Sequence, residues 1–437
     1  MPRRKKQFKN PTGMPDILKK ELSVFQDIQK IVTSFANFYN FSQISTPILE
    51  EEELFIKGTG EETDIIQKEI YSFSTQGKER VILRPEFTPS IIRAYIQNGM
   101  ETAPKPVKLW SFGPLFRHEK PQKGRLRQFH QFNFEILGSD EPISDALLAQ
   151  VFANILIEMG IENWKLHVNS IGCKNCRNVY IKKLKSHYRN KTRSICPECK
   201  KRITKNPLRV LDCKEEKCQR IKKLAPQFVN YLCEECHLHF KSFLEFLDIM
   251  ELPYMLNPYL VRGLDYYEKT VFEFIPEGKE NISQSTLIGG GRYDSLVENL
   301  GGRPTPCLGG AGGVERIMEE LEENKIKISS NILEKNITFK ENPLLFIVQL
   351  GDMAKKDSLK IIEDFKKAKI KIAENLEKDN LKNQLDRASR IGVKYALILG
   401  QQECLNKRVI LRNMETGIQK IVNQKDLIKE IKKKLKK

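Results

Sequence analysis

Cysteines are concentrated in one part of the chain, since eight of the ten lie between Cys173 and Cys236. Lysine and arginine are frequent among them, so the composition of this stretch differs from that of the residues around it. Strand-like and helix-like patterns resume afterwards, which indicates that the stretch is inserted into another domain. A chain of 437 residues is also too long for one core of ordinary size. We therefore predict a first domain formed by residues 1–165 and 253–325, with an insertion domain at 166–252.

The eight cysteines form four close pairs, each separated by two or four residues. This spacing lets two thiolates bind one tetrahedral zinc ion, so eight thiolates would fill two sites. In a cytosolic chain, cysteines are more often thiols or metal ligands than disulfides. A set of small buried thiols without any metal is an equally good interpretation. The pairs are Cys173 and Cys176, Cys196 and Cys199, Cys213 and Cys218, and Cys233 and Cys236.

The first domain is expected to contain an antiparallel sheet. Apolar residues at helical spacing predict a helix over residues 20–43, and a short strand should follow at 44–49. Pro47 places that strand at an edge or an interface, because proline cannot donate to a strand ladder. Strands joined by hairpin-like connections, with helices alongside, predict an α+β domain. The further predicted elements are strands at 70–73, 81–83, 108–112 and 128–137 and a helix at 90–97.

The last part of the chain is predicted to form a separate small domain. Residues 326–342 are polar, lack apolar periodicity and are interpreted as a linker. After it, the runs LLFIVQL, YALILG and RVILRN alternate with helical patterns. This alternation favours an α/β domain over residues 343–437.

Charge and hydropathy indicate the surroundings of the protein. The net charge is +18, and so positive a surface attracts polyanions such as nucleic acid. A general richness in lysine explains the charge equally well. No apolar run approaches the roughly 18 residues that a membrane helix needs, and no apolar segment follows the basic first residues. We therefore expect a cytoplasmic protein without a membrane partner.

Two segments of the first domain combine charged and polar side chains at strand ends. In LRPEFT, Glu86 and Thr88 are suited to hold an ammonium group, although an exposed strand end with a salt bridge is the plainer interpretation. In the segment 113–138, Arg117 ends one strand, and a guanidinium there suits a phosphate or carboxylate. Gln131 and Glu135 lie at alternate positions of the returning strand and therefore share one face. A solvated basic hairpin would not explain this pair.

Two later segments add aromatic and glycine-rich patterns. LVRGLDYY contains Arg262, Tyr266 and Tyr267, and tyrosine hydroxyls suit the ring nitrogens of an imidazole ligand. An ordinary aromatic core is the more frequent meaning of such a pattern. In residues 287–317, glycines allow close approach of the backbone to a ligand, and Arg316 lies in the first turn of a helix. This stretch matches neither a P-loop nor a dinucleotide-binding fingerprint.

In this order, the segments resemble the signature motifs of the histidyl-tRNA synthetase family, which are class II enzymes. PILEEEELFIKGTGEETDIIQKEIYSF looks like motif 1 at the dimer interface, residues 113–138 like motif 2, and GGVERI like motif 3. LVRGLDYY and GGGRYD resemble the two signatures of the histidine enzymes. The end of the chain is similar to the anticodon-binding domain. The resemblance implies a class II α+β catalytic domain with a Cys-rich insertion and a C-terminal α/β anticodon-binding domain.

The resemblance also implies an activity and its partners. Such an enzyme ligates L-histidine to tRNA(His) through a histidyl-adenylate, uses ATP and Mg2+, and forms a homodimer through the motif 1 region. The catalytic residues would be Arg117, Arg262 and Arg316. Histidine would contact Glu86, Thr88, Gln131, Glu135, Arg262, Tyr266 and Tyr267, and ATP would contact Arg117, Gln131, Glu135 and Arg316. The tRNA acceptor end would meet Lys120, Gln122, Arg125 and Arg127.

Three positions depart from the family pattern, and they lie near the expected site. Phe87 replaces a usual glycine, Lys120 a common arginine, and Gly310 a common aromatic residue. Related enzymes carry similar insertions, for which structural Zn2+ is one of the two open interpretations. Its preferred ligands would be Cys196, Cys199, Cys213, Cys218, Cys233 and Cys236.

Two other functions compete with this interpretation. The first is a synthetase-like regulatory subunit of histidine biosynthesis, which would bind histidine without charging tRNA. Such subunits usually lose motif residues and the anticodon domain, whereas this chain retains Arg117, Arg262 and Arg316. The second is a zinc-dependent nucleic-acid-binding protein without activity. It leaves the ordered set of Glu86, Gln131 and Arg262 unexplained.

Overall fold

An eight-stranded sheet is the largest element of the fold, with strand order β1-β5-β6-β11-β10-β9-β7-β8. The computed structural model describes residues 8–120, 124–279, 285–328, 343–377 and 380–435. The six inner strands pair antiparallel, whereas the outer strands β1 and β8 pair parallel with their neighbours. The predicted antiparallel α+β domain is therefore confirmed. The strands are β1 (Ser42–Gln43), β5 (Val107–Phe116), β6 (Gln128–Leu137), β7 (Trp164–Ser170), β8 (Tyr254–Leu256), β9 (Glu268–Pro276), β10 (Ile288–Arg292) and β11 (Cys307–Gly313).

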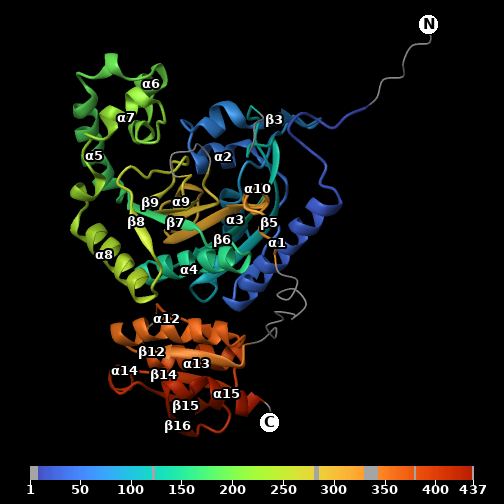
Figure 1. The fold of residues 1–437 in the computed structure, drawn as a ribbon, viewed down its shortest axis with the longest axis vertical. Coiled ribbons are helices and arrows are strands. Elements are labelled where there is room, and N and C mark those ends of the chain that lie inside the picture. The colour runs from blue at the N-terminus through green and yellow to red at the C-terminus, as the bar shows by residue number, and fades with distance from the viewer. Residues whose placement is uncertain (1–7, 121–123, 280–284, 329–342, 378–379, 436–437) are drawn as a thin grey trace.

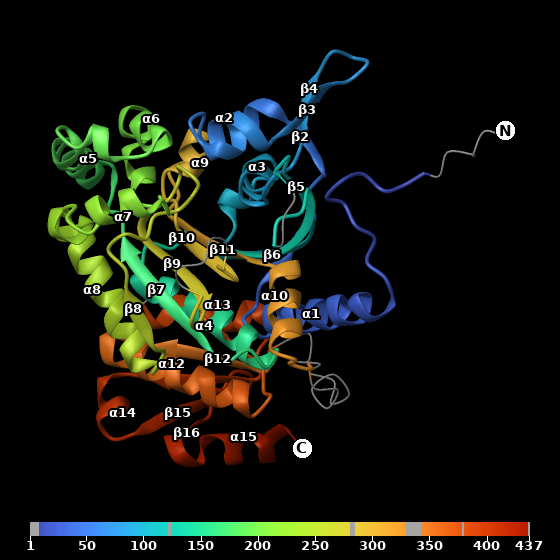
Figure 2. The ribbon, with the colours of Figure 1, turned by 45° about the horizontal axis from the view of Figure 1, so that its top comes forward.

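A second sheet of three strands projects beside the large one, in the order β2-β4-β3 (Figure 2). The predicted strand at 44–49 is wrong in extent, because β1 ends at Gln43 and pairing resumes only in β2. Pro47 lies in this break, where the chain leaves one sheet for the other and a proline costs no ladder hydrogen bond. The elements here are β2 (Leu49–Glu51), α2 (Glu52–Thr59), η1 (Ile65–Glu69), β3 (Tyr71–Ser74), β4 (Arg80–Leu83), α3 (Thr88–Gln97) and η2 (Met100–Thr102).

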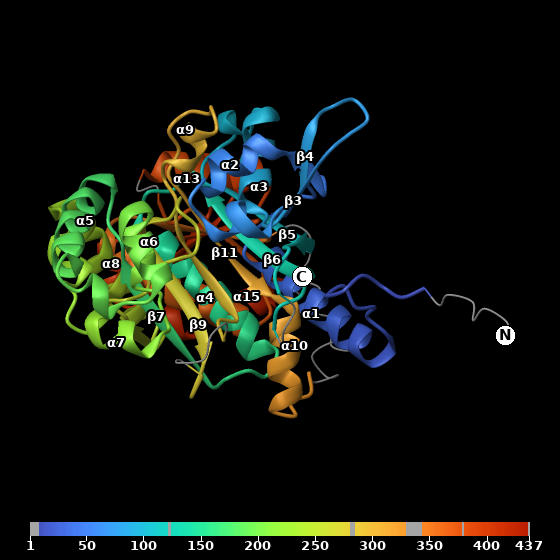
Figure 3. The same cartoon turned by 90° about the horizontal axis from the view of Figure 1, so that it is seen from above.

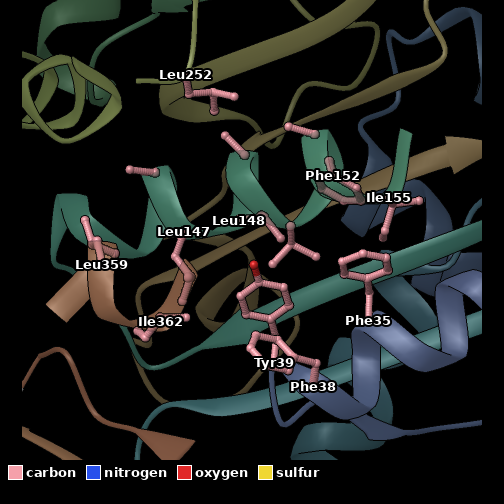
Figure 4. Packing of buried hydrophobic residues seen from close by; sticks show 14 of the residues in the cluster. Phe35, Phe38, Tyr39, Leu147, Leu148, Phe152, Ile155, Leu252, Leu359 and Ile362 are labelled. Carbon is pink, nitrogen blue, oxygen red and sulfur yellow. The ribbon is translucent and has the colours of Figure 1, made fainter. Parts of the chain in front are cut away.

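Helix α4 (Pro142–Glu158) forms the centre of the main core and is buried on nearly all sides. A helix that is apolar all round is expected inside a large protein. Phe35 and Tyr39 on or beside α1 (Lys19–Phe38) pack against Leu148 and Phe152 of α4 (Figure 4). The predicted helix at 20–43 is thus confirmed, although it ends five residues earlier. In the described parts of the chain, no helix is long and apolar enough to cross a membrane.

The cysteine-rich segment forms a helical layer at one side of the large sheet (Figure 3). Strand β7 continues in the sheet as far as Ser170, so the predicted boundary at residue 166 falls inside this strand. The segment ends in α8, which packs against α4 and returns the chain to β8. Its elements are α5 (Lys174–Tyr188), η3 (Thr192–Ser194), α6 (Pro197–Lys205), η4 (Pro207–Val210), α7 (Glu216–Lys222), η5 (Phe228–Tyr231) and α8 (Glu234–Ile249).

A five-stranded sheet with order β13-β12-β14-β15-β16 forms the C-terminal part (Figure 1). Strands β13, β12 and β14 are parallel and the last two antiparallel, which confirms the predicted α/β domain. It contacts the first domain through polar pairs such as Ser144 Oγ to Glu377 at 2.8 Å. The predicted linker lies outside the described residues from 329 onward. The elements are β12 (Leu345–Gln349), α12 (Asp352–Lys367), β13 (Ile372–Glu374), α13 (Leu381–Ile391), β14 (Tyr395–Leu399), α14 (Gln401–Leu405), β15 (Arg408–Asn413), β16 (Gln419–Asn423), η6 (Gln424–Asp426) and α15 (Leu427–Leu435).

One buried ion pair joins α4 to the sheet. Arg292 at the end of β10 donates its Nε–H to Asp145 at 2.9 Å, and both side chains are almost fully buried. Its Nη1 donates to the carbonyl of Ser139 at 2.8 Å. Burial alone would raise the pKa of Asp145, but the charges of Arg292 and His239 outweigh it and hold that pKa well below its usual range. Asp145 is therefore a buried carboxylate that depends on its partner.

We predict that Arg292→Met destabilises the protein by about 3–5 kcal/mol, because it leaves the Asp145 charge buried without its cation. Urea unfolding at pH 7 measures the loss. The low pKa of Asp145 stabilises the native state above the unfolded pKa of about 3.9, and this contribution disappears as pH falls through the folded pKa. In the variant, burial without the cation raises the pKa of Asp145 above its unfolded value, so the carboxyl takes up a proton in mild acid and the deficit should shrink between pH 7 and pH 4. The control Arg220→Ala, an exposed residue bonded to Glu216, should stay within about 0.5 kcal/mol of the wild type. An equal deficit at pH 7 and pH 4 would contradict the assignment.

Candidate active site

A cavity of about 260 Å³ opens on one face of the large sheet. Residues from all four of the motif segments predicted from the sequence line it, although these segments are up to two hundred residues apart. The structure thus brings most of the predicted side chains to one place. Those that line the cavity are Glu86, Thr88, Arg117, Arg125, Gln131, Arg262, Tyr266, Tyr267 and Arg316.

Two carboxylates are buried at one part of this site. Glu86 accepts hydrogen bonds from the hydroxyls of Tyr266 at 2.7 Å and Thr59 at 2.8 Å. Glu135 accepts one from Thr88 Oγ1 at 2.7 Å and is also in contact with the Tyr293 hydroxyl. Burial raises the pKa of Glu86 and raises that of Glu135 to about 8. Neutral hydroxyls orient both groups, but only Glu86 lines the cavity, so a positively charged ligand group would meet the Glu86 carboxylate.

Glycines in the central strands create the space for these side chains. A Cβ atom at position 309 would lie 1.5 Å from Glu135 Oε2, and one at Gly289 would lie 2.5 Å from the Arg262 guanidinium. Any larger residue on β11 or β10 would displace these two charged groups. The Gly-dense pattern seen in the sequence therefore allows side chains, and not only a ligand, to lie close to the backbone of these strands.

Arg262 lies in the loop before β9 and is half-buried. Its guanidinium contacts the carboxylate of Glu273, and it lies 5.6 Å from the centre of the Tyr267 ring. Glu273 also accepts a hydrogen bond from Thr286 Oγ1 at 3.0 Å, which holds this carboxylate in place. Among the described residues, the Nε of Arg262 has no hydrogen-bond partner. The side chain can therefore still bind a further acceptor.

Within the described residues, the guanidinium groups of Arg117 and Arg316 donate hydrogen bonds only to backbone carbonyls. Arg117 Nε donates to the carbonyl of Pro85 at 3.0 Å, and Arg316 Nη1 to that of Thr286 at 3.1 Å. Burial lowers the pKa of Arg316, and the positive charge of Arg117 lowers it further. Two facing cations without a carboxylate partner are suited to bind an anion with several oxygens, such as a polyphosphate.

The loop between β5 and β6 is only partly described. Arg125 lines the cavity and pairs with Glu119 at 2.6 Å, while Arg127 Nε donates to the Glu119 carbonyl at 3.1 Å. Lys120 is exposed. Gln122 lies outside the described residues. Of the predicted tRNA-contacting residues, Arg125 therefore lies at the cavity, and Lys120 and Arg127 lie on the described parts of the same loop.

Phe87 and Gly310, two of the departures from the family pattern, have a structural explanation. Phe87 is buried at the start of α3, with the guanidinium of Arg84 4.5 Å from its ring centre. A Cβ at Gly310 would lie 2.7 Å from the ring of Phe152 on α4. Phe152 thus occupies the space that a larger residue at 310 would need. The structure gives no reason for Lys120.

The cysteines gather in two sets of four at the ends of the insertion helices. Cys196, Cys199, Cys213 and Cys218 form the first cluster, and Cys173, Cys176, Cys233 and Cys236 form the second. In each cluster all four sulfur atoms lie within 4.8 Å of one another. The predicted six-cysteine subset is therefore corrected, because it left out Cys173 and Cys176. These two meet the pair at 233 and 236 only after the chain has folded back by almost sixty residues.

Several residues of the site were not expected from the sequence. Thr59 supports Glu86, Tyr293 supports Glu135, and Glu273 pairs with Arg262. Asn133 also lines the cavity, and its Oδ1 has no partner within the described residues. Of these, Tyr293 had a signal in the sequence because it belongs to GGGRYD, and Asn133 had one because it alternates with Gln131 and Glu135 on one strand face. Hydroxyls that orient a carboxylate leave no pattern along the chain.

Comparison with known proteins agrees with this geometry. The family model of histidyl-tRNA synthetase matches residues 13–191 and 200–317, and that of the anticodon binding domain matches 345–434. A histidine–tRNA ligase of Desulfitobacterium hafniense is 41% identical over 94% of this chain and 95% of its own. One from Dehalococcoides mccartyi is 39% identical over 98% of this chain and 100% of its own. The apo histidyl-tRNA synthetase of S. aureus superposes with a TM-score of 0.60 at 31% identity, covering 97% of this chain and 99% of that one. This chain belongs to the histidyl-tRNA synthetase family.

Proposed function

We propose that the protein attaches L-histidine to tRNA(His) in two steps. Histidine and ATP first form a histidyl-adenylate and release pyrophosphate, and the histidyl group then passes to the tRNA with release of AMP. One observation carries the proposal. A single cavity is lined by the buried carboxylate of Glu86, which favours a cation, and by Arg117 and Arg316, whose guanidinium groups bond only to backbone carbonyls within the described residues and favour an anion. Histidine and ATP present these two kinds of group.

The amino-acid end of the cavity is suited to histidine. Glu86 and Thr88 would bind its amino group, while Gln131, Glu135 and the hydroxyls of the two tyrosines would surround the remainder, including the imidazole ring. The rings of Tyr266 and Tyr267 lie 4.7 Å apart between centres and are tilted by 43° to each other, so each ring restricts the direction of the other's hydroxyl-bearing edge. Glu135 is better placed to act on histidine than on ATP, because its carboxyl group contacts the hydroxyls of Thr88 and Tyr293.

The nucleotide would bind through Arg117 and Arg316 on its phosphates. Mg2+ would share the phosphate charge, and carboxylate oxygens of the kind it prefers line the cavity at Glu119, Glu273 and Glu315. Arg262 would stabilise the charge that develops as the histidine carboxylate attacks the α-phosphate. Its unpartnered Nε supports this role, because a donor remains for the reacting oxygens.

The tRNA would meet the protein at several positions. Lys120, Gln122, Arg125 and Arg127 would contact the acceptor end at the mouth of the cavity, and the C-terminal sheet would bind the anticodon. The net charge of +18 favours such contacts through phosphate neutralisation. A regulatory subunit without tRNA charging is less well supported, since all three arginines and the C-terminal sheet are present. The alternative of a nucleic-acid-binding protein without enzymatic activity does not explain the cavity.

We further propose a division into domains and a homodimer. The catalytic domain would comprise residues 1–165 and 253–325, with the insertion at 166–252, a linker at 326–342 and the anticodon-binding domain at 343–437. The homodimer would form through the three-stranded sheet, where Leu49 and Phe73 are exposed although both are large and apolar. A cytoplasmic location stays a prediction.

Arg262→Ala should lower histidine-dependent ATP–pyrophosphate exchange by about a hundredfold or more while the protein still folds, because it removes a charge that acts on the transition state. Exchange assays on the purified full chain, followed by tRNA charging, measure this. The wild type should perform both reactions. Arg220→Ala is the matched control, since it removes an exposed guanidinium far from the cavity lining, and it should leave exchange unchanged. Undiminished exchange in the Arg262 variant would remove its assigned role.

Glu135→Gln should weaken histidine binding and yet stabilise the protein. Because the folded pKa of Glu135 is about 8 and the unfolded one about 4.3, the native state binds the extra proton between these values and loses stability as pH rises. Removing the charge should therefore raise the free energy of unfolding by about 1–3 kcal/mol at pH 8 and by almost nothing at pH 4. Thermal unfolding at both pH values, with calorimetry of histidine binding, tests this. A variant that is less stable at pH 8 would contradict it.

We also propose that each cysteine cluster binds structural Zn2+. Tetrahedral zinc with Zn–S bonds of about 2.3 Å holds its sulfur atoms about 3.8 Å apart. The distance between Cys196 Sγ and Cys213 Sγ is 3.9 Å, and that between Cys173 Sγ and Cys176 Sγ is 3.6 Å. Backbone N–H groups also point at the sulfurs, as from Cys233 to Cys176 Sγ at 3.0 Å. These contacts suit thiolates better than a plain set of buried thiols.

Metal analysis of the purified protein should find about two zinc ions per chain, one for each set of four thiolates. Cys199→Ser and Cys236→Ser should each lower the content by about one, because three ligands bind a structural zinc far more weakly than four. Cys307→Ser is the control, since this buried thiol belongs to neither cluster. A content below about half an equivalent in freshly purified wild type would rule out stoichiometric sites.

A further inference from the structure

The loop of residues 260–267, which contains Arg262 and both tyrosines, separates two cavities. The candidate active site lies on one side. On the other side is a second cavity of about 290 Å³, lined by this loop and by the insertion. Arg262, Leu264 and Tyr267 line both cavities. The loop shares a hydrophobic cluster with Leu208 and Val210 of the insertion, and beside the second cavity its position also depends on the polar side chains that reach across.

Three side chains of the insertion reach across to the backbone or side chains of this loop. Asn206 Nδ2 donates to Asp265 Oδ1 at 2.6 Å, and Arg209 Nη1 donates to the carbonyl of Gly263 at 3.0 Å. Arg177 donates to the carbonyl of Asp265 at 3.3 Å and contacts that of Tyr267. Each contact lies within three residues of Arg262 or of a substrate-facing tyrosine.

These side chains are held by the cysteine clusters. Asn206 and Arg209 lie between Cys199 and Cys213, on the turn at η4 that the first cluster closes. Arg177 follows Cys176 of the second cluster directly in sequence. The turn is also tied to the segment after α2, because Arg209 Nη2 donates to Asp64 at 2.8 Å. A metal that closes the first cluster would therefore fix the direction of both donors.

The same loop is connected to the carboxylate that faces the amino group. The Asp265 N–H donates to the Thr59 carbonyl at 3.2 Å, and a Cβ at Gly60 would lie 2.9 Å from Asp265. The hydroxyls of Thr59 and of Tyr266, the residue after Asp265, both donate to Glu86. A shift of Asp265 would thus move both hydroxyls that orient Glu86.

We infer that Asn206 and Arg209 are positioning residues for the amino-acid site, and that metal at the first cysteine cluster sets the affinity for histidine through them. The inference rests on the proposed function, because it takes histidine as the ligand of this cavity. Asn206 holds Asp265, the neighbour of Tyr266 at the amino-acid end, whereas Arg117 and Arg316 at the phosphate end are bonded to the carbonyls of Pro85 and Thr286. The effect should therefore appear in the binding of the amino acid and not in that of ATP.

The test uses the full chain with its metal content measured. Asn206→Ala should raise the dissociation constant for L-histidine, measured by calorimetry without ATP, by about tenfold. In pyrophosphate exchange, KM for histidine should rise similarly, while KM for ATP and kcat at saturating histidine stay within about twofold of the wild type. Arg209→Ala should act in the same direction, and Arg209→Lys should recover part of the affinity because a donor is retained. Arg220→Ala, on the outer face of α7, is the control and should change nothing.

Unchanged histidine affinity in Asn206→Ala with full metal content would overturn the positioning role, and so would an equal rise in both KM values. For the metal, Cys199→Ser should lose one zinc ion and bind histidine at least as weakly as Asn206→Ala. A folded Cys199→Ser protein that lacks this zinc but keeps its histidine affinity would overturn the metal dependence. A wild type that shows no histidine-dependent exchange would sink the proposed function instead, so the two failures are distinguishable.

Discussion

The central strands pack against the core with one face and leave space for the cavity on the other, and the rest of the molecule depends on this difference. On β6, Phe132 and Phe134 point to the core around α4, while Gln131 and Asn133 alternate with them and line the cavity; Glu135 lies on the same face but is fully buried. The neighbouring strand β11 supplies no side chain at most of these positions. Gly310 and Gly312 make room for Phe152 and Phe132 in the core, and Gly309 makes room for the Glu135 carboxylate on the other face. The sheet is therefore densely packed behind and hollow in front.

The hollow face contains charges that the protein itself leaves incomplete. Arg292 and Asp145 show what a completed buried pair looks like, with cation, carboxylate and carbonyl in direct contact. In the cavity, by contrast, Glu86 is held by hydroxyls, and Arg117 and Arg316 by backbone carbonyls. Such partners orient a charge without neutralising it. The charged side chains of the cavity thus remain able to pair with ligands. Leaving them without a neutralising partner costs stability, which the surrounding core offsets.

The cysteine-rich insertion belongs to this arrangement and is not a separate attachment. Its first cluster lies beside the turn with Asn206 and Arg209, and that turn reaches the loop of residues 260–267 across a cavity. The apolar core of this small helical layer is shared with the loop, and cross-links of this kind add to its rigidity. The insertion leaves the sheet after β7 and returns through the edge strand β8 beside β7, while the loop leads into β9 on the other side of β7.

The amino-acid sequence alone was sufficient for the class of fold, the motif segments and the arginines and tyrosines of the cavity lining, because period-two alternation, glycine density and charged residues at strand ends are local properties. It also indicated the small α/β domain and the pairing of cysteines at short range. It did not reveal that Cys173 and Cys176 join Cys233 and Cys236, that Pro47 interrupts a strand, or that Thr59 and Tyr293 orient the two carboxylates. These depend on which distant segments become neighbours. Contacts across almost sixty residues or more leave no periodic signal along the chain, so only the packed structure decides them.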